Sequence, residues 1–221
     1  EVSTEPKHVD GIDRSPLARL MGTTALTLAG QAHEPLVADF LDLTPKDLPG
    51  DVDAIICNPP YTRDQDLPAD YKESINTQIE RETGLDVSLR SPLYAYFMYH
   101  SRKFLATGDR ASFITPQSFL ATNYGESLKQ FLLQHFDVKA LVLFDPTAEP
   151  VFEEALTTGL ITFLEATEGE EATGCTRFIR VDEETEVQTL RKAVRDGQQG
   201  STNWGSINCV QQAELVPERN W

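Results

Sequence analysis

Short apolar runs alternate with stretches of helical periodicity along this chain of 221 residues, and this alternation restricts the fold more than any other feature. Short apolar runs bounded by turn residues are typical of buried strands, and the segments between several of them are long enough for helices. The pattern predicts an α/β fold with a doubly wound, mostly parallel sheet. The expected strands cover residues 8–12, 36–40, 52–57, 111–115, 138–144 and 157–164.

Helix signals lie between several of these strands. Ser91-Pro92 provides a helix start, and the pattern behind it predicts a helix that ends near Gly108. Two further helices are expected over residues 126–135 and 183–195. The polar segment 62–90 has weak periodicity, so it either borders a substrate cleft or forms a solvated insertion. The core residues expected from the first helical pattern are Leu93, Tyr96, Phe97, Phe104 and Leu105.

The tetrapeptide Asn58-Pro59-Pro60-Tyr61 directly follows the apolar run 53–57. Ordinary residue usage predicts it by chance in roughly one chain of this length in a thousand. An aromatic amine or amide nitrogen is a poor nucleophile because its lone pair is delocalised. The side-chain oxygen of Asn58 and the carbonyl of Pro59 can each accept one amine hydrogen, which favours the pyramidal nitrogen that attacks a methyl group.

The remaining residues of the tetrapeptide suit the same chemistry. Pro59 and Pro60 stiffen the turn, and because they carry no N–H the turn does not continue as a helix. Tyr61 offers a flat face on which a base removed from its stack can rest. We therefore predict Asn58, Pro59, Pro60 and Tyr61 as catalytic residues. The alternative is a strand that ends in a Pro-Pro turn with a core tyrosine.

In this motif the chain resembles the amino-group DNA methyltransferases, specifically the N6-adenine methylases of restriction-modification systems. The resemblance implies a Rossmann-like fold, S-adenosylmethionine as cofactor, DNA as partner and the 6-amino group of adenine as methyl acceptor. Protein-glutamine methyltransferases and some RNA guanine methyltransferases share the tetrapeptide, so it indicates the chemistry better than the substrate. The alternatives are a protein-glutamine methyltransferase and a non-catalytic remnant or interaction module that does not bind the cofactor alone.

The resemblance runs from about residue 9 to residue 166, and it implies residues that bind the cofactor. Residues 9–18 resemble the second strand of the family and its turn, where Asp13 would hold the ribose hydroxyls, as an acidic residue does in dinucleotide folds. Ser15 before Pro16 is a good helix start, which leaves Asp13 free at the strand tip. The alternative for Asp13 is a solvated turn residue.

The run 36–41 resembles the third strand of the family. There Asp39 would accept a hydrogen bond from the adenine amino group of the cofactor, Phe40 would pack on that ring, and Asn58 would also contact the cofactor. An acidic strand end with a core phenylalanine is the alternative. Residues 149–152 resemble the loop that provides a second base-stacking aromatic, which makes Phe152 a substrate-binding candidate beside Tyr61, although aromatics near strands also form cores.

Two parts of the family pattern do not occur in this sequence. The family binds the methionine part of the cofactor with a first strand and a Gly-rich turn, but no Gly-x-Gly is present. The second part is a target-recognition domain: residues 211–221 resemble only the lead-in that precedes this domain in long members of the family. We expect a methyltransferase catalytic domain over 1–166 that lacks its first strand, and a C-terminal extension over 167–221.

This organisation implies partners besides DNA. They are an N-terminal segment and a target-recognition domain or specificity subunit. Alone, the chain is expected to bind S-adenosylmethionine weakly, and to self-associate through the strand edges that the first strand would cover.

The net charge of −16 is unusual for a protein that meets phosphates. We interpret it as the surface of a halophile's protein, in which salt screens self-repulsion. The alternative is a separate basic region that binds DNA. With no apolar run near 18 residues and no signal peptide, a soluble, cytoplasmic protein is expected.

The cysteine pattern indicates neither disulfides nor a metal. Cys57, Cys175 and Cys209 are odd in number and lack paired metal-ligand spacing. Cys57 lies within an apolar run and is expected to be a buried, inert thiol.

Overall fold

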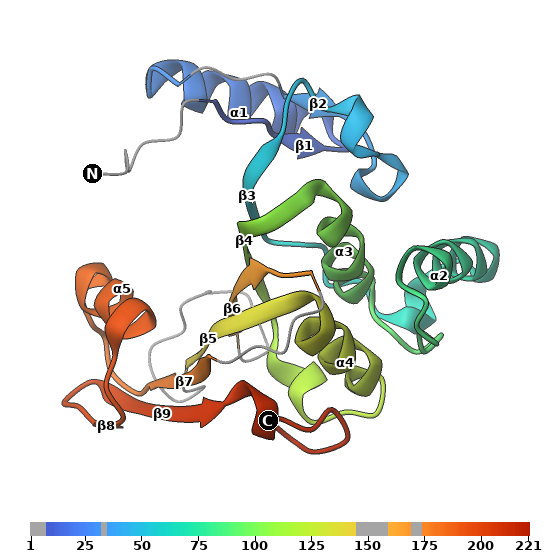
Figure 1. Ribbon diagram of the computed structural model, residues 1–221. Coiled ribbons are helices and arrows are strands. Elements are labelled where there is room, and N and C mark those ends of the chain that lie inside the picture. The colour runs from blue at the N-terminus through green and yellow to red at the C-terminus, as the bar shows by residue number, and fades with distance from the viewer. Residues whose placement is uncertain (1–7, 32–34, 145–158, 169–173) are drawn as a thin grey trace. The chain divides into compact units, whose positions relative to one another are not determined.

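The computed structural model describes residues 8–31, 35–144, 159–168 and 174–221. The chain folds as two compact units, residues 1–51 and residues 52–221, and each is considered by itself. The first unit contains β1 (Ile12–Asp13), α1 (Pro16–Leu28) and β2 (Leu36–Val37). β1 and β2 pair in parallel, with Asp13 opposite Val37 (Figure 1).

Helix α1 begins as its sequence predicts. Ser15 is extended and its hydroxyl accepts a hydrogen bond from the N–H of Ala18 at 3.3 Å, while Pro16 takes the first helical position, where a missing N–H costs nothing. The strands on either side are shorter than predicted. β2 ends at Val37, and Phe40–Asp42 form a 3-10 turn.

In the described part of the second unit, seven strands form one sheet in the order β3-β4-β6-β5-β7-β9-β8. The pairs β3–β4 and β5–β7 are parallel, whereas β6 is antiparallel to β4 and β5. β3, β4, β5 and β7 therefore run in one direction. The strands are β3 (Val52–Cys57), β4 (Leu105–Pro116), β5 (Phe136–Phe144), β6 (Gly159–Ala166), β7 (Cys175–Val181), β8 (Gly200–Ser201) and β9 (Gly205–Gln211).

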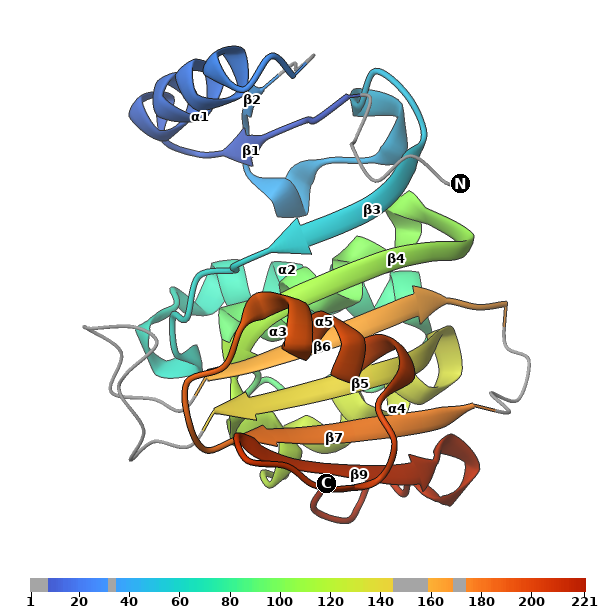
Figure 2. The same ribbon diagram turned by 90° about the vertical axis from the view of Figure 1, so that its left-hand side faces the viewer.

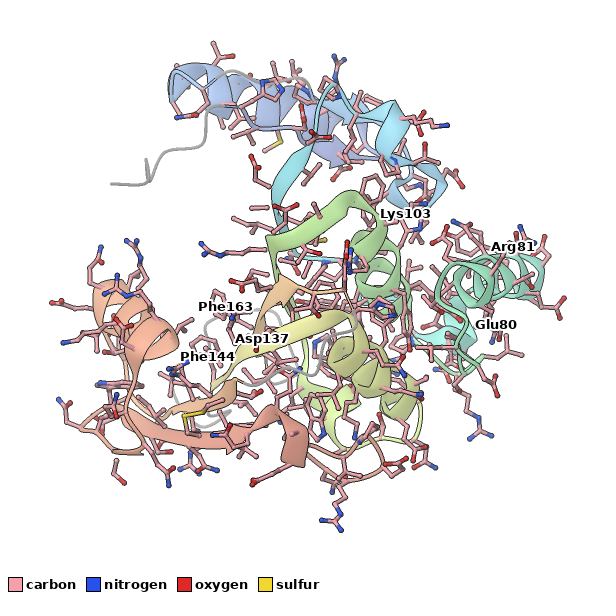
Figure 3. All side chains as sticks on the ribbon, viewed as in Figure 1. Glu80, Arg81, Lys103, Asp137, Phe144 and Phe163 are labelled. Carbon is pink, nitrogen blue, oxygen red and sulfur yellow. A yellow bond between two sulfur atoms is a disulfide. The ribbon has the colours of Figure 1, made fainter. Side chains whose placement is uncertain are left out.

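Helices cover both faces of this sheet. α2 (Ala69–Thr83), α3 (Leu93–Ser101) and α4 (Gly125–His135) lie on one side and α5 (Val187–Asp196) on the other (Figures 1 and 2). On the α5 side, Phe144 and Phe163 pack against the buried cluster that includes Ala193 (Figure 3). The predicted α/β class is thus confirmed. The buried side chains contributed by α3 and α4 on the opposite side include Tyr94, Tyr96, Met98, Tyr99, Leu128, Phe131 and Leu132.

The predicted helix after Pro92 ends earlier than expected. α3 stops at Ser101, a 3-10 turn follows over Arg102–Phe104, and Leu105 already belongs to β4, where it pairs with Val52 of β3. Helical spacing alone does not separate a helix from a buried turn that leads into a strand. Gly108 adopts a φ of 91° within β4, so this glycine permits a backbone conformation inside the strand rather than a helix end.

The polar segment 62–90 is not a solvated insertion throughout. Its central part forms α2, which buries Ile75, Asn76 and Ile79 and ends at Gly84 in the left-handed conformation. The hydroxyl of Tyr96 in α3 donates to Oδ1 of Asn76 at 3.0 Å. The weak periodicity arises because a narrow apolar stripe is sufficient for a helix that packs on one neighbour.

The expectation of no disulfide is wrong. Cys175 and Cys209, 34 residues apart in the sequence, are joined between β7 and β9 with their Cα atoms 5.8 Å apart (Figure 3). Antiparallel pairing places Cys209 opposite Arg177, two residues from Cys175, so strand register brings the two sulfurs together. Cys57 has a free, half-buried thiol, and burial raises its pKa to about 11.

The segment expected as a C-terminal extension adds strands to the same sheet as the motif strand. β7 and β9 lie within residues 167–221, and β7 pairs directly with β5. A functional division at residue 166 stays a prediction. In the described residues, no helix is both long and apolar enough to cross a membrane.

The outer edge of β3 generates a first prediction. Among the described residues β3 pairs with β4 alone, and the side chain of Ile56 is 89% exposed. Because an unpaired edge with an apolar side chain invites strand addition, we expect the chain of 221 residues to self-associate in light scattering at low and high salt. Ile56→Lys should reduce the association, whereas Val187→Lys, at an exposed apolar site on α5, should not. A stable monomer at both salt concentrations would contradict this expectation.

A second prediction concerns Gln212, which fastens the C-terminal segment to the middle of the sheet. Its side-chain oxygen accepts from the N–H of Val138 at 2.7 Å, its nitrogen donates to the carbonyl of Phe136 at 2.8 Å, and the residue is 4% exposed. Gln212→Ala leaves two buried backbone groups unpaired, each costing about 1–3 kcal/mol. We expect the unfolding free energy from urea denaturation to fall by about 2–6 kcal/mol.

The matched control for this substitution is the neighbouring glutamine. Gln211 is exposed at the end of β9, so Gln211→Ala should change the unfolding free energy by less than about 0.5 kcal/mol. An equal loss of unfolding free energy in the two variants would show that the hydrogen bonds from the Gln212 side chain to β5 do not stabilise the fold.

Candidate active site

The tetrapeptide Asn58–Tyr61 leaves the carboxyl end of β3. β4 ends at Pro116 and β5 ends at Phe144, and since both strands run in the direction of β3, all three carboxyl ends lie at one edge of the sheet (Figure 2). In open α/β sheets ligands bind outside the carboxyl ends of the strands. This edge is therefore the candidate active site of the second unit.

Within the motif, Pro59 is buried while Asn58 and Pro60 are exposed. The hydroxyl of Tyr61 lies 2.8 Å from Oδ1 of Asn58 and 3.0 Å from the carbonyl oxygen of Ile114 in β4, so its single hydrogen is shared between these two acceptors. Burial raises the pKa of Tyr61, which keeps the hydroxyl protonated as a donor. The contact fixes Asn58 and Tyr61 relative to each other and to β4.

The ring of Tyr61 is held on one side and open elsewhere. It meets the ring of Tyr94 in an edge-to-face contact, with centroids 6.5 Å apart and an interplanar angle of 86°. The residue is still 39% exposed. The N–H of Leu93, at the start of α3, donates to the carbonyl of Thr62 at 2.9 Å, which ties the chain after the motif to this helix.

The motif retains acceptors for an amine. A carbonyl oxygen has two lone pairs, so Oδ1 of Asn58 can accept from Tyr61 and from one further donor. Among the described residues no hydrogen bond engages the Pro59 carbonyl. Two acceptors and an aromatic surface thus lie within four consecutive residues. This arrangement can bind a planar group that carries an NH₂.

The cofactor candidates Asp13 and Asp39 lie in the first unit, at the carboxyl ends of β1 and β2. Asp13 is exposed but not free, because its Oδ1 accepts from the N–H of Ser15 at 2.7 Å. Asp39 accepts from the N–H of Leu41 at 3.0 Å, and its Oδ2 lies 3.6 Å from Arg14. The expectation that capping by Ser15 leaves Asp13 without a local partner is therefore wrong.

These carboxylates still fit the polar groups of a nucleoside. An ionised carboxylate has about four acceptor positions, so Asp13 keeps positions for two ribose hydroxyls and Asp39 keeps one for an amino group. The N–H of Ala38 donates to the carbonyl of Asp13 at 3.2 Å, which holds the two strand ends together. Phe40 is half-buried next to Asp39. The residues present fit the ribose and adenine of S-adenosylmethionine, and their roles stay predictions.

The structure brings some of the predicted residues together. Asn58 and Tyr61 share a hydrogen bond, and Asp13 and Asp39 lie on paired strands, but the two groups belong to different compact units. Phe152 lies outside the described residues. Sequence reasoning did not select Tyr94, and its contact with Tyr61 could have been suspected only from the position of its helix soon after the motif.

Comparison with known proteins agrees with the geometry. The sequence pattern of the Eco57I restriction-modification methylase family matches residues 32–152. The chain is 30% identical over 202 residues to the type II methyltransferase M.XamI of Xanthomonas campestris pv. amaranthicola, which covers 89% of this chain and 37% of M.XamI. It is 34% identical over 111 residues to M.AccI of Acinetobacter calcoaceticus, covering 49% and 19% of the two sequences. The chain thus spans less than two fifths of the length of each of these curated relatives.

A solved structure shows the same fold. The methyltransferase subunit of a type I restriction-modification system from Streptococcus thermophilus superimposes with a TM-score of 0.68 at 12% identity, over 92% of this chain and 45% of that subunit. The Rossmann-like methyltransferase fold predicted from the sequence is thereby confirmed. Since the family match spans more than half of the sequence and includes Asn58–Tyr61, the chain belongs to the Eco57I restriction-modification methylase family.

Proposed function

We propose that this chain is the catalytic part of a restriction-modification enzyme that transfers a methyl group from S-adenosylmethionine to the 6-amino group of adenine in DNA. The observation that carries the proposal is the Tyr61 hydroxyl contact, which holds Asn58 beside a partly exposed aromatic ring at the carboxyl edge of the sheet. Membership of the Eco57I family supports DNA as the substrate, rather than the protein glutamine of the alternative. The choice of adenine rests on the tetrapeptide.

Asn58 and Pro59 supply the central step of the mechanism. Oδ1 of Asn58 and the carbonyl of Pro59 each accept one hydrogen of the amino group, which localises the nitrogen lone pair for attack on carbon. Tyr61, with Phe152 as the second aromatic, clamps the base outside its stack. When bound, S-adenosylmethionine supplies a reactive methyl group on a sulfonium. No general base is needed before the attack, because the proton can leave the nitrogen afterwards.

Cofactor binding is assigned to Asp13, Asp39 and Phe40, with Asn58 adjoining the reacting end. The ribose hydroxyls donate to Asp13, the adenine amino group donates to Asp39, and Phe40 packs on the adenine ring. Asp39 must keep an acceptor position despite the ion pair with Arg14. The exposed position of that arginine side chain lets it turn away at little cost.

The proposed enzyme is larger than this chain, in line with the 37% of M.XamI that the chain spans. We assign the Gly-rich cofactor turn and target recognition to further segments or subunits, and DNA binding to the assembled enzyme in the cytoplasm. The net charge of −16 makes non-specific attraction of phosphates by this chain weak. Either a basic partner region or adaptation to high salt accommodates that charge.

A third prediction separates the roles of Asn58 and Asp13 in the full-length enzyme. Asn58→Ala removes one acceptor used in the transition state, and a comparable loss costs about 10² to 10³ in rate. Its affinity for S-adenosylmethionine should hardly change. Asp13→Ala should weaken cofactor binding and affect the chemical step at saturation much less. Single-turnover methylation and calorimetric titration measure the two quantities.

The chemical identity of the methylated product shows which group accepts the methyl in the same experiment. Nucleoside analysis of the methylated DNA should find N6-methyladenine, and methylated glutamine or another methylated base would contradict the proposed substrate. If both substitutions lowered cofactor affinity alike and left single-turnover methylation intact, Asn58 would be a structural turn residue. Asp53→Ala serves as the control, because Asp53 is exposed on β3, the strand that precedes Asn58. This substitution should change neither the single-turnover rate nor the cofactor affinity.

A further inference from the structure

The hydroxyl groups of Ser118, Tyr124 and Tyr94 form a hydrogen-bonded row, and the ring of Tyr94 packs on the motif residue Tyr61. Ser118, exposed after the end of β4, lies 2.8 Å from the hydroxyl of Tyr124. Tyr124 in turn lies 3.0 Å from the hydroxyl of Tyr94, which is 2% exposed and packs edge-to-face on Tyr61. A hydroxyl both donates and accepts, so the three form a continuous row.

We propose that Tyr94 is a positioning residue for the target base, which sets the orientation of the Tyr61 ring and is itself oriented by Tyr124 and Ser118. The inference rests on the proposed function, because it assigns to Tyr61 the surface on which the base lies. It extends the site from the tetrapeptide to α3 and to the segment 117–124 that follows β4.

The chemistry of Tyr94 supports a positional role. A phenylalanine at this position would pack equally well. A buried hydroxyl loses its hydration and needs a hydrogen-bond partner to offset that loss, so the hydroxyl of Tyr94 serves more than packing. The hydrogen bond to Tyr124 fixes where the hydroxyl end of the Tyr94 ring lies, and the edge-to-face contact relates the position of that ring to the Tyr61 ring. Burial and the neighbouring hydroxyl of Tyr124 raise the pKa of Tyr94, so the Tyr94 hydroxyl stays protonated around neutral pH.

The segment that carries Ser118 and Tyr124 is itself held firmly. The carbonyl of Leu120 accepts from the ammonium group of Lys129 at 3.2 Å and from the N–H of Trp221 at 3.1 Å. Lys129 is buried in α4, and it also donates to the carbonyl of Arg219 at 2.7 Å. Residues 219–221 and α4 thus hold the segment between them, which gives the hydroxyl row a rigid support.

The other tyrosines of α3 are directed to different partners. The hydroxyl of Tyr96 donates to Asn76 in α2, and that of Tyr99 donates to Ser127 in α4 at 3.2 Å. Tyr99 is as deeply buried as Tyr94, and its ring contacts Phe131 at 4.9 Å between centroids. Tyr99 therefore provides a control with the same residue type, helix and burial but no contact with the motif residue.

The fourth prediction tests this role in the full-length enzyme, after the methylated site has been mapped in DNA from cells that express it. Since misplacement by about 1 Å can cost about 10²-fold, we expect Tyr94→Leu to lower the single-turnover rate about 10- to 100-fold and Tyr94→Phe about 3- to 10-fold. The fluorescence rise of 2-aminopurine at the target position, which reports base flipping, should fall in both variants. Cofactor affinity should stay unchanged.

The control variant decides between positioning and simple packing. Tyr99→Phe should lower the thermal midpoint about as much as Tyr94→Phe and leave methylation and 2-aminopurine fluorescence as in the wild type. Equal methylation and fluorescence for these two variants would overturn the positioning role, and Tyr94→Phe decides the question if Tyr94→Leu does not fold. A wild-type enzyme that does not methylate adenine would instead overturn the proposed function, and this inference with it.

Discussion

The parallel pairing of β3 with β4 is the interaction on which the candidate active site depends. It aligns Cys57 with Phe113, so that the tetrapeptide after β3 begins beside the last residues of β4. The Tyr61 hydroxyl then reaches both Asn58 in its own turn and Ile114 in the neighbouring strand. A motif of four residues becomes a site because the next strand supplies its second anchor.

Around this strand pair, distant parts of the chain contact the carboxyl ends of the strands, where the motif lies. α3 contributes Tyr94 beside the motif tyrosine, and α4 contributes Lys129 beneath the segment after β4. The C-terminal residues complete the arrangement, since Trp221 donates to Leu120 and Gln212 pairs with β5 like an additional strand. Residues far from the motif in sequence thus determine how rigidly the motif is held.

Much of the second unit could be predicted because its signals are local. The apolar runs of β3, β5 and β6 and the helix over 125–135 each depend on side chains within one segment, as does the Ser15 cap of α1 in the first unit. The errors occur where distant pairing overrides local pattern. Leu105 continues a helical spacing but joins β4 opposite Val52, and the Cys175–Cys209 disulfide follows from the register of β7 and β9.

The sequence by itself determined the α/β class and predicted the chemistry of Asn58–Tyr61, because both inferences use only residue types and their order within short segments. Only the tertiary structure decided that Tyr61 is anchored to Ile114 and that Tyr94 packs against its ring. It also decided that Tyr124 is hydrogen-bonded to both Tyr94 and Ser118. These contacts join residues from four segments. Their hydrogen bonds depend on strand order and helix packing, which no local pattern encodes.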